Sequence, residues 1–286
     1  MSDQVMTGKP TSSATASTDQ IGLAEVDRAA VAHRMVQAGI LVTLIWKWKF
    51  FVFANGVYET IPLDDPFFPA WLRSAFVLRV AFLVTVATAA LNTLTTDRIV
   101  RRWCSLITMI GVTVLCVHQG SYNDMTFVTA WWTALWSLWF VHRMEKDDVS
   151  DLLDKGAFLS RLIISVILLG GGIGKWTAEY WSGEVFFNIY FIDRDFWLFN
   201  LLRANFDMET LRQISMWYSR QVVVIETVAG LGLWLLPPRW AAGLAMVILT
   251  SIALLSNFLL FSVLSCLIAL AAVGLLVDRR SSLRRT

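Results

Sequence analysis

The sequence predicts an all-α membrane protein, a polytopic transmembrane helical bundle of about eight spans. Of its 286 residues, 56% are hydrophobic and only 16% are charged, and the mean hydropathy is +0.59. Soluble domains are less apolar and carry more charge. Because one span takes about 20 residues, the chain has room for seven or eight helices and little else. The formal net charge of +2 predicts no nucleic-acid partner.

Apolar runs place the spans along the chain. The last two runs are separated only by Ser256 and Asn257, so one long broken helix, and hence seven spans, is the alternative. Read with generous boundaries, the runs are Val31 to Phe53, Trp71 to Leu91, Trp103 to Val117, Thr126 to Val141, Ala157 to Trp176, Trp217 to Leu236, Trp240 to Leu255 and Phe258 to Val277.

Basic residues set the predicted orientation. Loops rich in Lys and Arg stay in the cytoplasm, so we expect a multi-pass protein of the inner (plasma) membrane with both termini cytoplasmic, which favours eight spans. The expected domains are a disordered cytoplasmic tail over residues 1–25, a single transmembrane domain over 26–278 and a basic cytoplasmic tail over 279–286. The basic residues lie before the first span, after the second and after the fourth: Arg28, Arg34, Arg98, Arg101, Arg102, Arg143, Lys146 and Lys155.

The segment from Tyr180 to Met216 joins spans five and six on the opposite, outer side. It mixes acidic and basic residues with Phe and Trp, which makes it too apolar for a free loop. Such a composition is typical of amphipathic helices that lie on a bilayer surface. We therefore expect short interfacial helices between spans five and six.

Lys175 is the most informative single residue. It ends an apolar run directly after four glycines, and a charge within a membrane costs about 2.5 to 3.5 kcal/mol on insertion scales unless it is paired or hydrated. In the predicted topology Lys175, Glu226 and Arg79 all lie in the outer half of the bilayer. We therefore expect these three residues to belong to a polar pocket that opens outward. Three further candidates for cofactor contacts on that side are Lys47, Lys49 and His118.

Each of these charges also has a structural interpretation. Lys47 and Lys49 alternate with tryptophans, as in an interfacial belt with snorkelling lysines. Arg79 and Glu226 suit an interhelical ion pair, and Lys175 stands close enough to the outer boundary to snorkel.

The glycines before Lys175 have a packing interpretation. Gly170 and Gly174 have the spacing that lets a neighbouring helix approach closely. No metal site is predicted, because Cys104, Cys116 and Cys266 lie in apolar runs and neither they nor the histidines have ligand spacing.

Several segments together resemble the membrane domain of vitamin K-dependent gamma-carboxylases, whose bacterial relatives are the HTTM proteins. The resemblance extends over roughly residues 30 to 275. It implies a helical membrane domain that uses a reduced quinone, and it makes Lys175 the candidate base that deprotonates that quinone. The matching segments are Tyr58-Glu-Thr-Ile-Pro-Leu, the basic turn at Arg98 to Arg102, His118-Gln-Gly-Ser-Tyr-Asn-Asp, Gly174-Lys175 with Trp181-Ser-Gly183, Glu226-Thr-Val-Ala-Gly230, and Asn257 to Leu264.

Two histidines of the family have no counterpart, since Gly120 and the segment Ser251 to Ala253 stand in their places. These departures weigh against carboxylation itself. The first functional hypothesis is therefore an enzyme, or an enzyme remnant, that acts on or binds a quinone-like, lipid-soluble molecule. A lysine base needs a lowered pKa, and a nearby Glu226 would instead hold the ammonium charged, so the distance between Lys175 and Glu226 tests that role.

The alternative hypothesis is a non-enzymatic scaffold, complex subunit or small-molecule carrier with a soluble or membrane protein partner. This hypothesis predicts no cavity at Lys175 and an exposed flank that is flat and apolar or rich in tryptophan. The candidates for that flank are Trp131, Trp132, Trp136 and Trp139.

Overall fold

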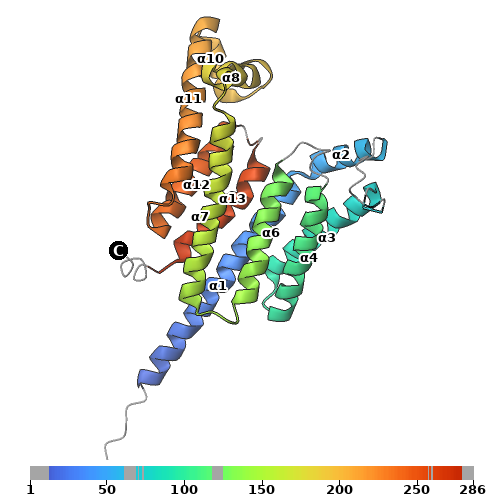
Figure 1. Ribbon diagram of the computed structural model, residues 1–286, viewed down its shortest axis with the longest axis vertical. Coiled ribbons are helices and arrows are strands. Elements are labelled where there is room, and N and C mark those ends of the chain that lie inside the picture. The colour runs from blue at the N-terminus through green and yellow to red at the C-terminus, as the bar shows by residue number, and fades with distance from the viewer. Residues whose placement is uncertain are drawn as a thin grey trace, which may run out of the picture.

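Every regular element among the described residues is helical. The computed structural model describes residues 13–60, 69, 71–72, 74–117, 125–256, 258 and 260–278, and no strand occurs among them. Figure 1 shows the helices as an elongated bundle. The helices are α1 (Ser13–Trp46), α2 (Trp48–Thr60), α3 (Ala75–Leu94), α4 (Arg98–Val117), α6 (Thr126–Arg143), α7 (Val149–Gly174), α8 (Ala178–Ser182), α9 (Glu184–Phe187), the π-helix η1 (Asn188–Ile192), α10 (Trp197–Asn205), α11 (Met208–Gly232), α12 (Pro238–Leu255), α13 (Phe261–Val273) and the 3₁₀-helix η2 (Gly274–Leu276).

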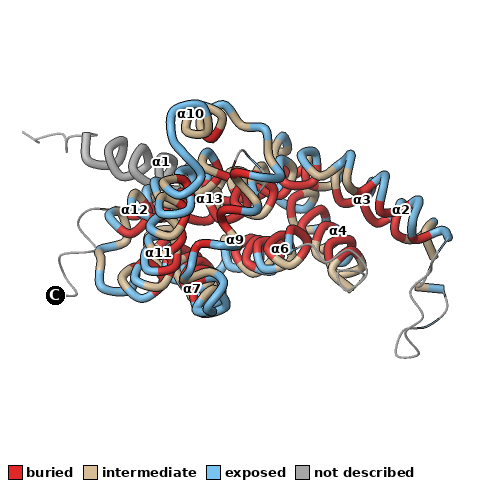
Figure 2. The backbone as a smooth tube through the Cα atoms, turned by 90° about the horizontal axis from the view of Figure 1, so that it is seen from above, coloured by how far each residue is buried: buried red, intermediate tan, exposed pale blue. Residues whose placement is uncertain are grey.

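The centre of the bundle is formed by α1 and α13. α1 packs against α13, α3 and α6, and α13 also contacts α7 and α12. In Figure 1, α3 and α4 lie on one side of this centre and α7, α11 and α12 on the other. Buried residues follow the inward faces of the helices in Figure 2. Two apolar clusters fill the interior, one around Ile40, Phe82 and Leu115 and one around Phe140, Ile164 and Leu249.

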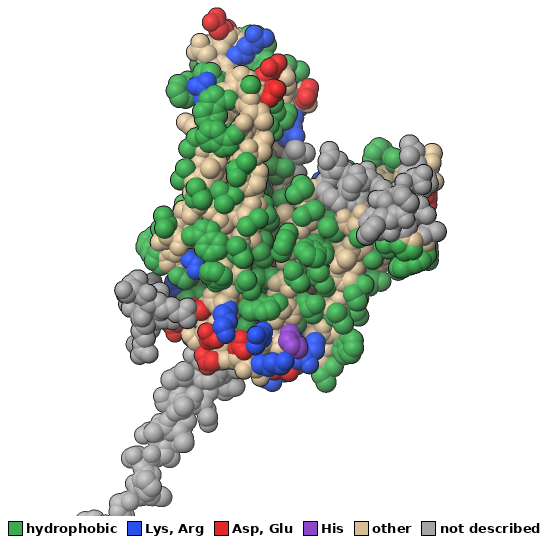
Figure 3. Space-filling view, viewed as in Figure 1, with side chains coloured by type: hydrophobic (Ala, Val, Ile, Leu, Met, Phe, Trp, Pro, Cys, Tyr) green, Lys and Arg blue, Asp and Glu red, His purple; other side chains and the backbone are tan. Residues whose placement is uncertain are grey.

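Among the residues that the structure describes, five helices are long and apolar enough to cross a membrane, judged by length and composition: Arg28–Trp46 within α1, α3, α4, α7 and α12. Large apolar side chains also stand exposed on the bundle, Leu235 by 86%. Figure 3 shows hydrophobic side chains over the middle of one face and charged side chains gathered toward its ends. Exposed apolar surface of this extent indicates a partner that is itself apolar. The predicted all-α class is confirmed, and the apolar helices indicate a membrane protein.

Each of the eight predicted runs overlaps a different long helix, in order α1, α3, α4, α6, α7, α11, α12 and α13, and the last run also includes η2. The first run differs in detail, because α1 ends at Trp46, Lys47 forms a turn and α2 begins at Trp48. Hydropathy cannot locate this break, since both of its flanks are apolar. Residues 13–25, which we expected in a disordered tail, form the first turns of α1. Residues 1–12 and the basic tail at 279–286 lie outside the described residues.

The short helices predicted between spans five and six are present as α8, α9, η1 and α10. Gly183 allows the tight connection from α8 to α9, because its φ of 81° lies in the left-handed region that favours glycine. α11 begins earlier than the apolar run predicted. Asp207 caps this helix by accepting a hydrogen bond from the Thr210 backbone N at 2.8 Å, so residues 208–216 extend α11 and do not form a loop.

Close packing of α7 against α11 uses glycines other than the predicted pair. A Cβ atom added at Gly170 or Gly174 would meet nothing within 4 Å, so the spacing of these two residues does not mark the helix contact. A Cβ at Gly172 would instead lie 3.0 Å from the Thr227 backbone N, and one at Gly230 would lie 3.0 Å from the Leu169 backbone N. The contact face is rotated away from the one that the spacing predicted.

Replacing Gly172 by Val should therefore separate α7 from α11. We expect a loss of about 1 to 3 kcal/mol in the free energy of unfolding, the usual cost of overpacking. Thermal unfolding of the purified protein in detergent measures it. Gly174→Val is the matched control, because it adds the same atoms to the same helix in open space, and equal losses in both variants would contradict the assigned contact.

Candidate functional site

The end of α7 places Lys175 at the edge of the bundle. The helix stops at Gly174, and the Lys175 backbone N closes its last turn by donating to the Gly172 carbonyl at 3.0 Å. Thr177 then caps α8, because its side chain accepts a hydrogen bond from the Tyr180 backbone N. Lys175 thus lies in the turn between α7 and α8. The hydrogen bonds that end α7 and begin α8 fix the position of its backbone.

Lys175 forms an ion pair with Glu226 of α11. The ammonium Nζ lies 2.6 Å from both Oε1 and Oε2 of the carboxylate. The Glu226 side chain is only 7% exposed and that of Lys175 25%, so water screens the pair weakly. A carboxylate at this distance stabilises the charged ammonium. The geometry is that of an ion pair in which one ammonium contacts both carboxylate oxygens.

The same pair lies in the wall of a pocket of about 520 Å³. Cavities of about 300 to 1,000 Å³ are typical of small-molecule sites. α7, α11, α12 and α13 supply most of its apolar lining, and Val185, Phe186 and Ile189 of the short helices supply more. The polar residues that line it include Lys175, Glu226, Tyr180, Tyr190, Tyr218, Arg194, Ser219 and Ser256.

The tyrosines and Arg194 were not predicted as site residues. Arg194 donates to the Ser256 carbonyl at 3.1 Å and lies 5.2 Å from the centre of the Tyr190 ring. Burial raises the pKa of the Tyr190 phenol, so that phenol stays protonated and able to donate a hydrogen bond. The sequence signal for Tyr190 and Arg194 is the mixture of aromatic and charged residues between spans five and six. That mixture predicted only a segment on the membrane surface.

The structure does not bring Arg79 to Glu226. Arg79 instead pairs with Glu59 of α2 and donates to the Asn55 side chain. The pairing of Arg79 with Glu226 that we considered is therefore wrong, because α2 supplies a closer carboxylate.

The two lysines predicted to contact a cofactor also lie elsewhere. Lys47 lies over the Phe50 ring at 4.7 Å and Lys49 is exposed on α2. Neither of them, nor Arg79, lines the pocket at Lys175. His118 falls outside the described residues.

The tryptophans of α6 do not form one exposed flank. Trp136 is buried, stacks on Phe140 with 4.6 Å between ring centres and donates to the Gly156 carbonyl at 3.0 Å. Trp132 is 40% exposed.

Within the part of the chain that the structure describes, no group of His, Cys, Asp and Glu side chains is placed to hold a metal ion.

The arrangement can bind an apolar molecule that carries one polar end. The ion pair offers a hydrogen-bond donor and an acceptor side by side, and the buried phenol adds a donor.

Comparison of the chain with protein-family models, with curated proteins and with solved structures gave no match.

Removing both partners of the ion pair should destabilise the protein by less than the sum of the two single losses. Lys175→Met leaves the Glu226 carboxylate buried without a cation, and Glu226→Gln leaves the ammonium without an anion. We expect each single variant to lose about 1 to 3 kcal/mol, between the values of exposed and fully buried pairs, and the double variant to lose less than the sum. Thermal unfolding of all four proteins measures the coupling, and strictly additive losses would show that the two residues do not interact.

Proposed function

We propose that this chain is a multi-pass membrane protein whose pocket binds a quinone-like, lipid-soluble molecule with its polar head at Lys175 and Glu226. The observation that carries the proposal is that a partly buried ion pair forms part of the wall of a mainly apolar pocket. Buried charges in membrane proteins are costly to retain and commonly mark ligand or ion sites.

The shape and chemistry of the pocket favour a ring with oxygen substituents. A quinol hydroxyl can donate to Glu226, and a ring oxygen can accept from the Lys175 ammonium. Leu168, Val222 and Leu264 are among the apolar lining residues that would contact the ring. A fully apolar ligand would cover Lys175 and Glu226 without making a hydrogen bond to either, so the site favours a molecule with a polar end.

The resemblance to HTTM proteins points to the same class of ligand. The resemblance also implies that Lys175 is a base. The ion pair does not suit that role, because a nearby carboxylate favours the charged form of a lysine. We assign Lys175 as a hydrogen-bond donor that also holds Glu226, and Glu226 as the group that accepts a proton or a hydrogen bond from the ligand. The non-enzymatic alternative predicts no cavity at Lys175, so the pocket supports the ligand-binding hypothesis.

Filling the pocket should abolish quinone binding without breaking the ion pair. Gly170 lines the pocket, and a Cβ added there meets nothing within 4 Å, so Gly170→Leu extends a side chain into the empty space. We expect the Kd for decylubiquinone, measured by isothermal titration in detergent, to rise at least about tenfold, which corresponds to about 1.4 kcal/mol.

Gly174→Leu is the control, since Gly174 also has open space around its Cβ position but does not line the pocket. It should bind the quinone as the unmodified protein does. Unchanged binding in Gly170→Leu, or no binding by the unmodified protein, would refute the proposed function.

We further propose that eight helices cross the inner membrane: α1, α3, α4, α6, α7, α11, α12 and α13. The five long apolar helices support this arrangement, and the clustering of Arg and Lys at the connections before α4 and after α6 supports cytoplasmic termini. The helices α8 to α10 would then lie at the outer interface. Their Phe and Tyr residues pack into a cluster of their own around Phe186, Phe191 and Phe199.

Cysteine labelling tests this orientation. In a variant without Cys104, Cys116 and Cys266, a cysteine at Lys146 should react with a membrane-impermeant maleimide only after the membrane is opened. A cysteine at Glu179 should react in intact spheroplasts. Reaction of both from the same side would rule out an odd number of crossings between them and so contradict the proposed path of α7.

A further inference from the structure

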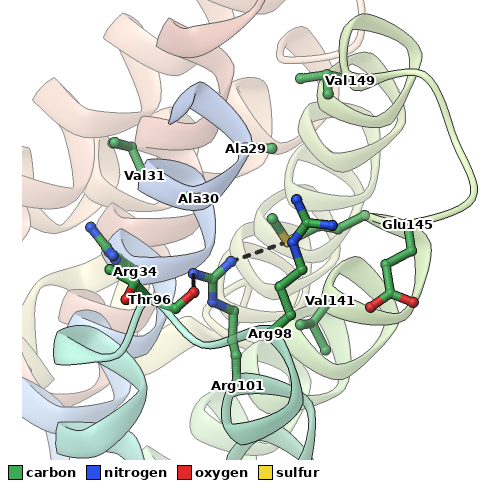
Figure 4. Close-up of a pocket in the computed structure, with 11 residues that line it drawn as sticks. Ala29, Ala30, Val31, Arg34, Thr96, Arg98, Arg101, Val141, Glu145 and Val149 are labelled. Carbon is green, nitrogen blue, oxygen red and sulfur yellow. Dashed lines mark hydrogen bonds between the residues drawn. The ribbon is translucent and has the colours of Figure 1, made fainter. Parts of the chain in front are cut away.

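A second pocket, of about 510 Å³, opens at the end of the bundle opposite the short helices. It lies where α1, α4, α6 and α7 come together. Figure 4 shows Arg34 from α1 and Arg98 and Arg101 from α4 around the same space. Ala29, Ala30, Val31, Val141 and Val149 supply apolar lining, and Glu145 is the one carboxylate among the described residues that line it.

The arginines of this pocket lack acidic partners. No ion pair among the described residues includes Arg34, Arg98 or Arg101. Glu145 is already held by Arg102 at 2.8 Å. Arg34 donates to the Thr95 carbonyl at 3.3 Å and Arg101 to the Thr96 carbonyl at 3.4 Å, and these acceptors carry no formal charge. The pocket is therefore lined by three cations and by one carboxylate that is already paired with Arg102. Asp97 acts on Arg101 only from beyond ion-pair distance.

Burial makes this shortage of anions significant. Arg101 is only 5% exposed, and the Nε atoms of both Arg101 and Arg34 are buried without any hydrogen-bond partner. A buried guanidinium normally has a carboxylate or phosphate in bidentate contact. The basic residues that orient a membrane protein need only lie in a loop near the bilayer, so orientation alone does not account for a buried one.

We propose that this pocket binds a phosphate group, with Arg34, Arg98 and Arg101 as its ligands. A phosphate group can accept hydrogen bonds from guanidinium groups and supply the negative charge that these three arginines lack. Basic pockets between membrane helices on the cytoplasmic side are suited to the head groups of anionic lipids. The apolar lining and the exposed Val31 and Ile99 beside it favour a phospholipid over free phosphate, because they offer contact for the glycerol and acyl parts.

Lipid binding to the purified protein tests the site. Native mass spectrometry of the delipidated protein with added phosphatidylglycerol should show a bound lipid, with at least tenfold weaker binding of phosphatidylcholine. The double variant Arg34→Gln with Arg98→Gln should lose at least tenfold in phosphatidylglycerol binding. Arg101 is left in place because it is buried and holds the connection before α4. A parallel titration with inorganic phosphate distinguishes a free anion from a lipid head group.

Arg143→Gln is the matched control. Arg143 is exposed at the same end of the bundle and pairs with Asp147 at 3.3 Å, but it does not line the pocket. It should bind phosphatidylglycerol as the unmodified protein does, and a thermal unfolding curve confirms that every variant is folded.

Selective binding of phosphatidylglycerol or of inorganic phosphate supports the site if the double variant loses that binding. The probe that binds shows whether the ligand is a lipid head group or a free anion. Binding of neither probe, equal binding by the double variant, or an equal loss in Arg143→Gln would overturn it.

Discussion

The close contact between α7 and α11 is the constraint on which the candidate site depends. Gly172 and Gly230 let each helix approach the other to backbone distance. Glu226 stands one residue before Thr227, the residue that Gly172 touches, so this contact carries its carboxylate to the end of α7. A Cβ at Gly171 would lie 3.3 Å from Glu226 Oε2. The glycine run and the ion pair are therefore one feature, in which small residues clear the space that a buried carboxylate and its lysine occupy.

The helices were predictable because the signal for them is local. A run of apolar residues long enough to span a bilayer has few other stable structures, and each predicted run indeed overlaps a helix. Within such a run, hydropathy changes little from residue to residue. The turn at Lys47 was for that reason invisible, and with it the separate helix α2 that supplies Glu59 to Arg79.

The pairing of charges was less predictable than the charges themselves. Lys175, Glu226 and Arg79 were identified as unusual because each stands in an apolar run. Which of them meet depends on the rotation of each helix about its axis, and the spacing of Gly170 and Gly174 indicated the wrong face of α7. Tyr180 and Tyr190 of the pocket come from the short helices and Tyr218 from α11. The local pattern indicated that the short helices exist, but their position beside the pocket depends on tertiary contacts.

At the end of the bundle opposite the short helices, the exposed and the less exposed arginines differ in their partners. The exposed Arg102 and Arg143 meet acids, whereas among the described residues the less exposed Arg34 and Arg101 do not. Exposed arginines would be enough to orient the chain. Burying Arg101 adds a desolvation free energy that no ion pair within the described part of the chain offsets. The cost is offset if an anion from outside the chain completes the pocket, so that residues which set topology also form a binding site.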